Sequence, residues 1–203
     1  MQARNSEGKL SRTFTERARR AQIVSAAITT IAEVGYRNAS FAQIAKRAGL
    51  SSTGLISYHF ASKDELIGEV VEAVLADLGA FMADRMPAAG AAATALRAYI
   101  ESIVDFTGTH REPMKALTEI FINGGFSYDA DSERAAVSPL EDILRSGQAS
   151  GEFRAFDPTV MATLVQRAVD GLPFLLNVRP DLDVAAFGRE VSTVFDLATR
   201  AQR

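Results

Sequence analysis

The stretch SSTGLISYHFASKDEL, residues 51–66, decides the fold of this chain. It opens with short hydroxyl residues, which favour the start of a helix. Ile56 and Phe60 lie one helical turn apart, so both are expected to face the core. Ser62 and Glu65 have the spacing of a capping box, which predicts that another helix begins there. The stretch therefore predicts a short helix with one face in the core and another face free for a partner.

Two more helices are predicted before this stretch. The first covers about residues 15–34, and its apolar stripe has helical spacing. That stripe consists of Ile23, Ala26, Ala27, Thr30 and Ile31. Ser40 and Gln43 form a capping box for a second helix over residues 41–48, which Gly49 ends. Three short helices with a tight glycine turn between the second and third predict a helix-turn-helix unit, whose third helix enters the major groove of DNA.

The residues of the third helix have the chemistry that this role requires. Thr53 and Gly54 fall in its first turn, and Gly54 has no side chain to hold the helix away from the bases. Tyr58 and His59 follow about one turn later and can donate hydrogen bonds to phosphate. Lys63 adds a positive charge nearby. Considered alone, His59 could be a structural histidine and Lys63 a solvated surface lysine. The DNA-binding interpretation therefore depends on these residues occurring together.

The charge distribution also points to a polyanion. The chain has a net charge of −3, but residues 1–63 contain ten Lys and Arg against three Glu, and the remaining 140 residues carry −10. A basic segment followed by an acidic one favours a nucleic-acid partner for the first part. A solvated basic tail without a partner is the alternative. On charge alone we assign the arm residues Arg12, Arg17, Arg19 and Arg20 to DNA.

A set of spaced positions then gives a family resemblance. The positions are Gly35–Tyr36, Ser40, Ile44–Ala45, Ala48–Gly49–Leu50–Ser51, Gly54, Ile56, His59–Phe60, Lys63 and Leu66. Residues 17–75 resemble the N-terminal domain of the tetracycline-repressor (TetR) family. The resemblance implies DNA contacts, and we carry them over to Ser40, Ser52, Thr53, Gly54, Ser57, Tyr58, His59 and Lys63.

The chain departs from the family pattern in two places. Ser57 stands where the family often has tyrosine, and a serine can donate to phosphate but reaches less far. The segment from Gly49 to Phe60 is also one residue longer than the commonest spacing, with the extra residue near Ser51 or Ser52. This leaves open which of the residues 52–54 faces the bases.

The whole chain is predicted to be all-α, with about nine helices. We expect a disordered basic arm over residues 1–14, a helix-turn-helix domain over 15–63 and a helical regulatory and dimerisation domain over 64–203. The later helices are predicted over residues 62–85, 91–107, 112–123, 132–149, 157–177 and 181–200. Pro173 falls inside one of them and removes a backbone hydrogen bond to residue 169, which could bend that helix.

The resemblance implies a two-fold dimer built by the last two helices. We assign the interface to Leu164, Ala168, Leu172, Leu175, Phe187, Val191, Val194 and Phe195, with Val160 and Leu197 on the same apolar faces. It also implies a pocket for a small-molecule effector, for which apolar residues with a few polar ones are suited. The candidate lining residues are Phe106, His110, Met114, Leu117, Phe121, Phe126, Gln166, Asp170 and Phe174. Packing within one subunit is the alternative for both sets.

The sequence thus predicts a ligand-responsive regulator, most often a repressor in this family, that binds a palindromic operator in double-stranded DNA as a homodimer. The chain has no cysteine and two distant histidines, so we expect no metal and no cofactor. It has no run of eighteen apolar residues and no signal-peptide pattern, so we expect no membrane partner and a cytoplasmic protein. An enzyme is disfavoured because no catalytic motif is present. A ligand-sequestering helical bundle without operator binding is the alternative function.

Overall fold

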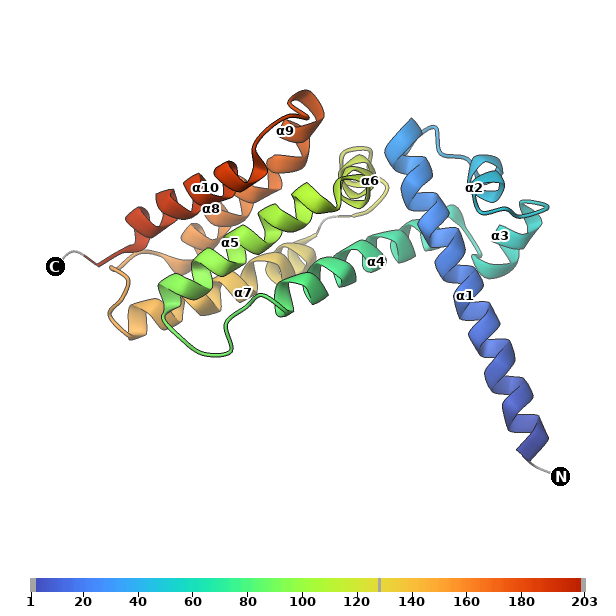
Figure 1. Ribbon diagram of the computed structural model, residues 1–203, viewed down its shortest axis with the longest axis horizontal. Helices are drawn as coiled ribbons and strands as arrows, with labels where there is room; N and C mark the ends of the chain where they lie inside the picture. The colour runs from blue at the N-terminus through green and yellow to red at the C-terminus, as the bar shows by residue number, and fades with distance from the viewer. Residues whose placement is uncertain (1–2, 128, 202–203) are drawn as a thin grey trace. The chain divides into compact units, whose positions relative to one another are not determined.

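The structure is a computed structural model of the chain; it describes residues 3–127 and 129–201, with side chains from residue 15 onward. The described residues form ten helices and no strand beyond one isolated bridge between Phe153 and Arg200 (Figure 1). The helices are α1 (Ala3–Val34), α2 (Phe41–Arg47), α3 (Gly54–His59), α4 (Lys63–Ala83), α5 (Ala92–Thr109), α6 (Arg111–Ile122), α7 (Ala130–Ala149), α8 (Pro158–Asp170), α9 (Leu172–Val178) and α10 (Val184–Thr199). The all-α fold is confirmed.

The chain forms two compact units. The first contains Met1–Val74 and Lys115–Phe126, and the second contains Leu75–Met114 and Ser127–Arg203. The predicted boundary after residue 63 therefore lies inside the first unit, since α4 contributes its beginning to that unit. A segment of α6, far along the sequence, also belongs to it.

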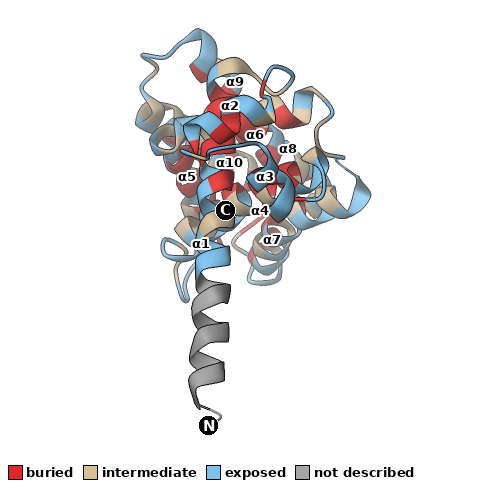
Figure 2. Ribbon diagram, turned by 90° about the vertical axis from the view of Figure 1, so that its right-hand side faces the viewer, coloured by how far each residue is buried: buried red, intermediate tan, exposed pale blue. Residues whose placement is uncertain are grey.

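In the first unit α2 packs against α1 and α3. The predicted stripe of α1 is buried throughout, and Ile44 of α2 and Ile56 of α3 are buried as well. Figure 2 colours buried residues red. Phe60 is also buried, as its spacing from Ile56 predicts. Helices α1, α2 and α3 each bury an apolar face here, because none of them alone can shield that face from water.

Helix α1 begins earlier than predicted. The structure places residues 3–14 in α1, where the sequence predicted a disordered arm and a helix start near residue 15. No proline interrupts these residues, and a helix that is already formed extends at little cost. The side chains of this arm, Arg12 included, lie outside the residues whose side chains are described.

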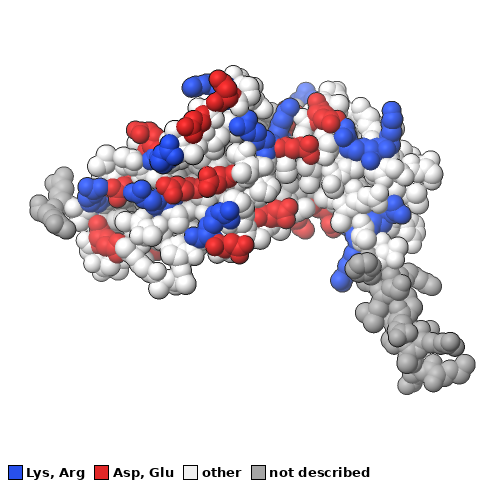
Figure 3. Space-filling view, viewed as in Figure 1, with Lys and Arg blue, Asp and Glu red and all other residues white. Residues whose placement is uncertain are grey.

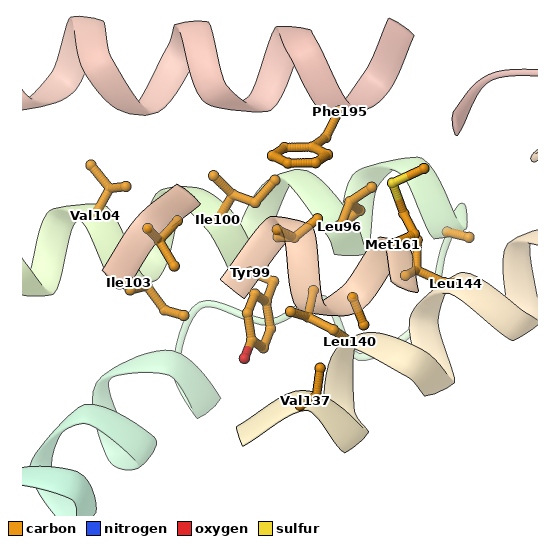
Figure 4. Packing of buried hydrophobic residues seen from close by; sticks show 14 of the residues in the cluster. Leu96, Tyr99, Ile100, Ile103, Val104, Val137, Leu140, Leu144, Met161 and Phe195 are labelled. Carbon is orange, nitrogen blue, oxygen red and sulfur yellow. The ribbon is translucent and has the colours of Figure 1, made fainter. Parts of the chain in front are cut away.

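In the second unit α5 is the central helix, and α7, α8, α9 and α10 pack against it. Figure 4 shows Leu96, Tyr99 and Ile100 of α5 meeting Leu140 and Leu144 of α7, Met161 of α8 and Phe195 of α10. Gly188 lets α10 approach α5 closely, because a Cβ atom there would lie 3.0 Å from Cγ1 of Val104. The core of this unit thus forms where each surrounding helix packs one apolar face against α5.

One predicted helix is divided in two. The sequence predicted a continuous helix over residues 157–177, but α8 ends at Asp170 and α9 begins at Leu172. Pro173 has no N–H to donate to residue 169 and its ring crowds the preceding turn, so the break falls at Gly171. The last helix also begins later than predicted: the carboxylate of Asp183, not Asp181, accepts from the N–H of Ala186 at 2.9 Å.

Candidate nucleic-acid interface

The turn before α2 is held by a complete capping box. The N–H of Gln43 donates to Oγ of Ser40 at 3.3 Å, and the N–H of Ser40 donates to Oε1 of Gln43 at 2.9 Å. Ser40 is exposed, so its hydroxyl lies at the surface where α2 begins. The sequence predicted this box, and the structure confirms it.

Helix α3 presents a small, polar and open first turn. Thr53 precedes it as the N-cap, and its side chain makes no capping hydrogen bond. Ser52, Thr53, Gly54 and Ser57 are all exposed. A Cβ atom at Gly54 would meet only Oγ of Ser52, at 3.5 Å, so the glycine leaves free space outside the helix. Such a surface can approach the floor of a groove closely, as base readout requires.

The end of α3 carries an exposed aromatic ring. Tyr58 is 78 % exposed, an unusual state for a large side chain, and its ring meets that of His59 edge-on at 5.0 Å. His59 is partly buried, and its Nδ1 is buried without a hydrogen-bond partner among the described residues. Only the other imidazole nitrogen is therefore suited to reach a phosphate.

Arg20 of α1 fixes the end of α3 from behind. Its guanidinium donates to the backbone carbonyl of His59 and lies 4.2 Å from the centre of the Phe60 ring. It also pairs with Glu65 at 3.2 Å and with Glu69 at 2.5 Å on α4. The hydrogen bond to Glu69 raises the pKa of Arg20. The pKa of Glu65 is lowered, first by the hydrogen bond from the N–H of Ala61 and second by the hydrogen bond from Arg20.

These contacts change the role assigned to Arg20. The sequence placed it in the DNA-binding arm, but its donors are used inside the protein, where they join α1, α3 and α4. No sequence signal identified this role, because the acidic partners lie more than forty residues away. Arg17 is exposed on the same helix and remains available to a phosphate.

Lys63 is likewise engaged within the protein. Its Nζ donates to the carbonyl oxygen of Tyr36 at 3.3 Å and lies 4.6 Å from the centre of the Tyr36 ring. The backbone N–H of Tyr36 in turn donates to Oε2 of Glu119 on α6, also at 3.3 Å. Lys63 thus holds the turn after α1. No pattern in the sequence indicated the contact of this turn with α6. Any DNA contact by Lys63 stays a prediction.

The positive charge of the first unit is partly neutralised. Arg47 at the end of α2 pairs with Glu33 of α1. Lys46 and Arg37 are exposed, and Figure 3 shows Lys and Arg side chains over α1–α3 on the face drawn. The surface of this segment therefore remains basic, as predicted, although Arg20, Arg47 and Lys63 interact with other groups of the protein.

Comparison with known proteins identifies this arrangement. The family model described as "Bacterial regulatory proteins, tetR family" matches residues 23–70, which lie within the first unit. The HTH-type transcriptional regulator BetI of Cronobacter sakazakii is 37 % identical over 177 residues, which cover 86 % of this chain and 85 % of that protein. The chain belongs to the TetR family. It is a DNA-binding transcriptional regulator.

Solved structures of transcriptional regulators share its fold. A bacterial regulatory protein of the TetR family from Rhodococcus RHA1 aligns with a TM-score of 0.78 at 18 % identity, over 91 % of this chain and 98 % of that one. The ketosteroid transcriptional regulator KstR2 of Mycobacterium tuberculosis aligns with a TM-score of 0.72 at 21 % identity, over 91 % and 96 %. Among the described residues of this TetR-family chain, we find no helical segment with the length and apolar character of a membrane span.

Helices α8 and α10, in the second unit of this TetR-family chain, each carry exposed apolar side chains. We call it the α8–α10 stripe; its members are Val160, Leu164, Val194 and Leu197, which are 52–64 % exposed. Two of the residues predicted for a dimer interface, Leu164 and Val194, belong to this stripe. Ala168, Leu175, Phe187 and Val191 are partly buried.

Two predicted interface residues are core residues instead. Leu172 is fully buried and Phe195 is 9 % exposed, and both pack in the core of the second unit. Their apolar spacing could not distinguish the side that faces α5 from the side that faces solvent. They have little surface left to contact a partner.

The residues predicted to line an effector pocket fall in both units. In the second unit the rings of Phe106 and His110 are stacked at 4.1 Å. In the first unit Phe121 and Phe126 meet edge-on at 5.6 Å, and Leu117 is buried. The remaining residues, Met114, Gln166, Asp170 and Phe174, belong to the second unit, where Phe174 is 49 % exposed and Gln166 is buried. An effector pocket lined by these nine residues stays a prediction.

A polar network crosses the core of the second unit. The buried hydroxyl of Tyr99 donates to the Ala136 carbonyl and lies 3.3 Å from Oε1 of Gln166, and Nε2 of Gln166 donates to Oδ1 of Asp170 at 2.8 Å. Burial, followed by the charge of Asp170, raises the pKa of Tyr99 to about 12. Burial likewise raises the pKa of Asp170, although Arg167 pairs with it at 2.7 Å. The network ties α8 to α5 and α7.

Proposed function

We propose that this regulator binds its operator as a homodimer through the exposed face of α3, and that a small-molecule effector releases it, so that it acts as a repressor in the cytoplasm. The observation that carries the DNA contacts is the open first turn of α3, where Ser52, Thr53 and Gly54 are exposed and make no competing side-chain cap. Ser40, Ser57, Tyr58 and the outer nitrogen of His59 would contact phosphates around it. Arg12 and Arg17 of the basic arm would add further phosphate contacts.

The dimer is supported by the α8–α10 stripe. Four large apolar side chains at a solvent-facing surface favour burial against a second protein surface. We expect this partner to be a second copy of the chain related by a two-fold axis. A palindromic operator requires two recognition helices related by the same symmetry. The interface would include Leu164 and Val194 at its centre.

The effector would act by preferring a conformation that binds DNA less well. Such a coupling between two sites typically changes affinity by about 1–3 kcal/mol. The nine predicted lining residues are the first positions at which to search for it. A ligand-sequestering bundle without operator binding is less well supported, since the relatives are transcriptional regulators.

The test is fluorescence anisotropy of the purified protein against a duplex from its own upstream intergenic region, with a scrambled duplex as control. Both are measured across a salt series. We expect tight, sequence-selective binding whose affinity falls log-linearly with salt. Equal and weak binding to both duplexes, together with failure to select any sequence from random duplexes, would overturn the proposal.

A further inference from the structure

A cavity in the first unit has no role in the function proposed above. It has a volume of about 340 Å³ and lies between the end of α1, the turn that follows it and one side of α6. Its lining residues are Ala32, Glu33, Val34, Gly35, Arg37, Asn38, Lys115, Glu119 and Asn123. This volume is at the lower end of the range of small-molecule pockets, about 300–1,000 Å³. None of the residues predicted for the effector pocket is among them.

Both carboxylates of the cavity wall have partners within the protein. Glu33 pairs with Arg47 outside the cavity. Oε2 of Glu119 accepts from the N–H of Tyr36 and from Nδ2 of Asn123, each at 3.3 Å. The charge of Glu33 is therefore neutralised by Arg47, whereas Glu119 is hydrogen-bonded to neutral donors and keeps its negative charge.

The two cations of the cavity wall, Arg37 and Lys115, differ from Glu33 in having no ion-pair partner among the described residues. Arg37 and Lys115 are exposed, and neither forms an ion pair within residues 15–127 and 129–201. Arg37 comes from the turn after α1 and Lys115 from α6, so the two cations reach the cavity from separate elements. Because Glu33 is paired with Arg47, these two cations outnumber the one unpaired carboxylate of the wall, Glu119, and the net positive charge can recognise an anion.

We propose that this cavity is a second small-molecule site, which takes one compact anion bearing carboxylate or phosphate groups. Arg37 and Lys115 supply the positive charge from two sides of the cavity, the turn after α1 and helix α6. The site would hold the turn after α1 against α6, where Glu119 already binds the backbone of Tyr36. It would therefore act on the first unit directly, at a place apart from the nine residues predicted for the effector.

The cations could instead contact the DNA backbone, but two observations favour a small anion. Lys115 lies on α6 and not on α1, α2 or α3, which form the helix-turn-helix unit. A phosphate of the duplex is bound at an exposed surface and requires no cavity.

The experiment is isothermal titration of the full chain with inorganic phosphate, succinate and citrate, each at constant ionic strength set with chloride. We expect saturable binding of one anion per chain for at least one of the three probes, which also distinguishes phosphate from carboxylate ligands. Arg37→Gln and Lys115→Gln should each weaken this binding about tenfold or more, since each removes a charged hydrogen-bond donor. The matched control is Arg97→Gln on the exposed surface of α5, which should leave the affinity unchanged.

The proposal is overturned by three results. One is the absence of saturable binding for all three anions. Another is equal weakening by Arg97→Gln, which would indicate a general charge effect. The third is that Arg37→Gln and Lys115→Gln leave anion binding unchanged but weaken duplex binding and each lower the salt slope by about one, as backbone contacts do. Because the titration contains no DNA, its outcome is independent of the proposed operator binding.

Discussion

Two exposed surfaces of this regulator differ in chemistry. The face of α3 presents Ser52, Thr53, Gly54, Ser57 and Tyr58, which are mainly small and polar. The α8–α10 stripe presents four large aliphatic side chains. A polar face is stable in water and indicates a partner only when charge and motif agree with it. An apolar stripe costs free energy in water at about 25 cal/mol per Å², so its exposure by itself favours a protein partner.

The two surfaces should control different aspects of DNA binding. The face of α3 should determine which DNA is bound, and the stripe should determine whether two such faces act together. Substitutions in the stripe are therefore expected to have larger effects on operator affinity than single changes on α3.

The largest effect is expected from Leu164→Glu combined with Val194→Glu. Burying two carboxylates in an apolar interface is so costly that the dimer should dissociate. Operator affinity should then fall at least about a hundredfold, roughly 3 kcal/mol, because a monomer contacts only one half-site. Sedimentation velocity and anisotropy measure the two effects. Ala135→Glu on the exposed surface of α7 is the control, and a double variant that remains a dimer would disprove the assignment of the stripe.

A second effect concerns the polar network that joins α8 to α5 and α7 on the buried side of the second unit. The pKa of Tyr99 is raised to about 12 from 10.0, so the folded protein holds the phenol proton where the unfolded chain has lost it. The stability that this group contributes is present below pH 10 and should be lost as pH rises from 10 to 12, by about 2–3 kcal/mol.

Urea unfolding across this pH range measures the loss. Tyr99→Phe should abolish that part of the pH dependence, while Tyr58→Phe, at an exposed position, should preserve it. An unchanged alkaline slope in Tyr99→Phe would show that Tyr99 does not titrate as its burial predicts.

A third effect tests the face of α3. Gly54→Ala should lower operator affinity about tenfold, roughly 1.4 kcal/mol, because its methyl group would hold the helix away from the groove. The fold should tolerate the change, since alanine favours a helix and the nearest atom lies 3.5 Å away. Anisotropy and thermal unfolding check both statements. Gly68→Ala on α4, where no atom lies within 4 Å, is the control; equal affinities of both variants would remove Gly54 from the interface.

The smallest effect is expected from Tyr58→Phe. It removes one neutral hydroxyl donor from an exposed ring, so operator affinity should fall about two- to fivefold, roughly 0.5–1 kcal/mol. The slope of affinity against salt should not change, because no charge is lost. A larger loss accompanied by a reduced slope would indicate that the ring organises neighbouring cations rather than contacting phosphate itself.

The helix-turn-helix unit could be predicted closely because its signals are local. The capping box of Ser40 and Gln43, the stop at Gly49 and the spacing of Ile56 and Phe60 depend on neighbours within a few residues. The structure confirms each of these features. The sequence also indicated that Pro173 would disturb its helix. The structure shows the result, a break at Gly171 between α8 and α9.

The sequence by itself determined the all-α fold, the DNA-binding unit and the family, because periodicity, caps and a spaced motif are written in consecutive residues. The tertiary structure decided which residues are free to act. It placed Arg20 and Lys63 in internal contacts, and it moved Leu172 and Phe195 from a predicted interface to the core. The physical reason is that an apolar helix side or a basic residue finds its partner across the fold, where sequence spacing carries no information about which surface it meets.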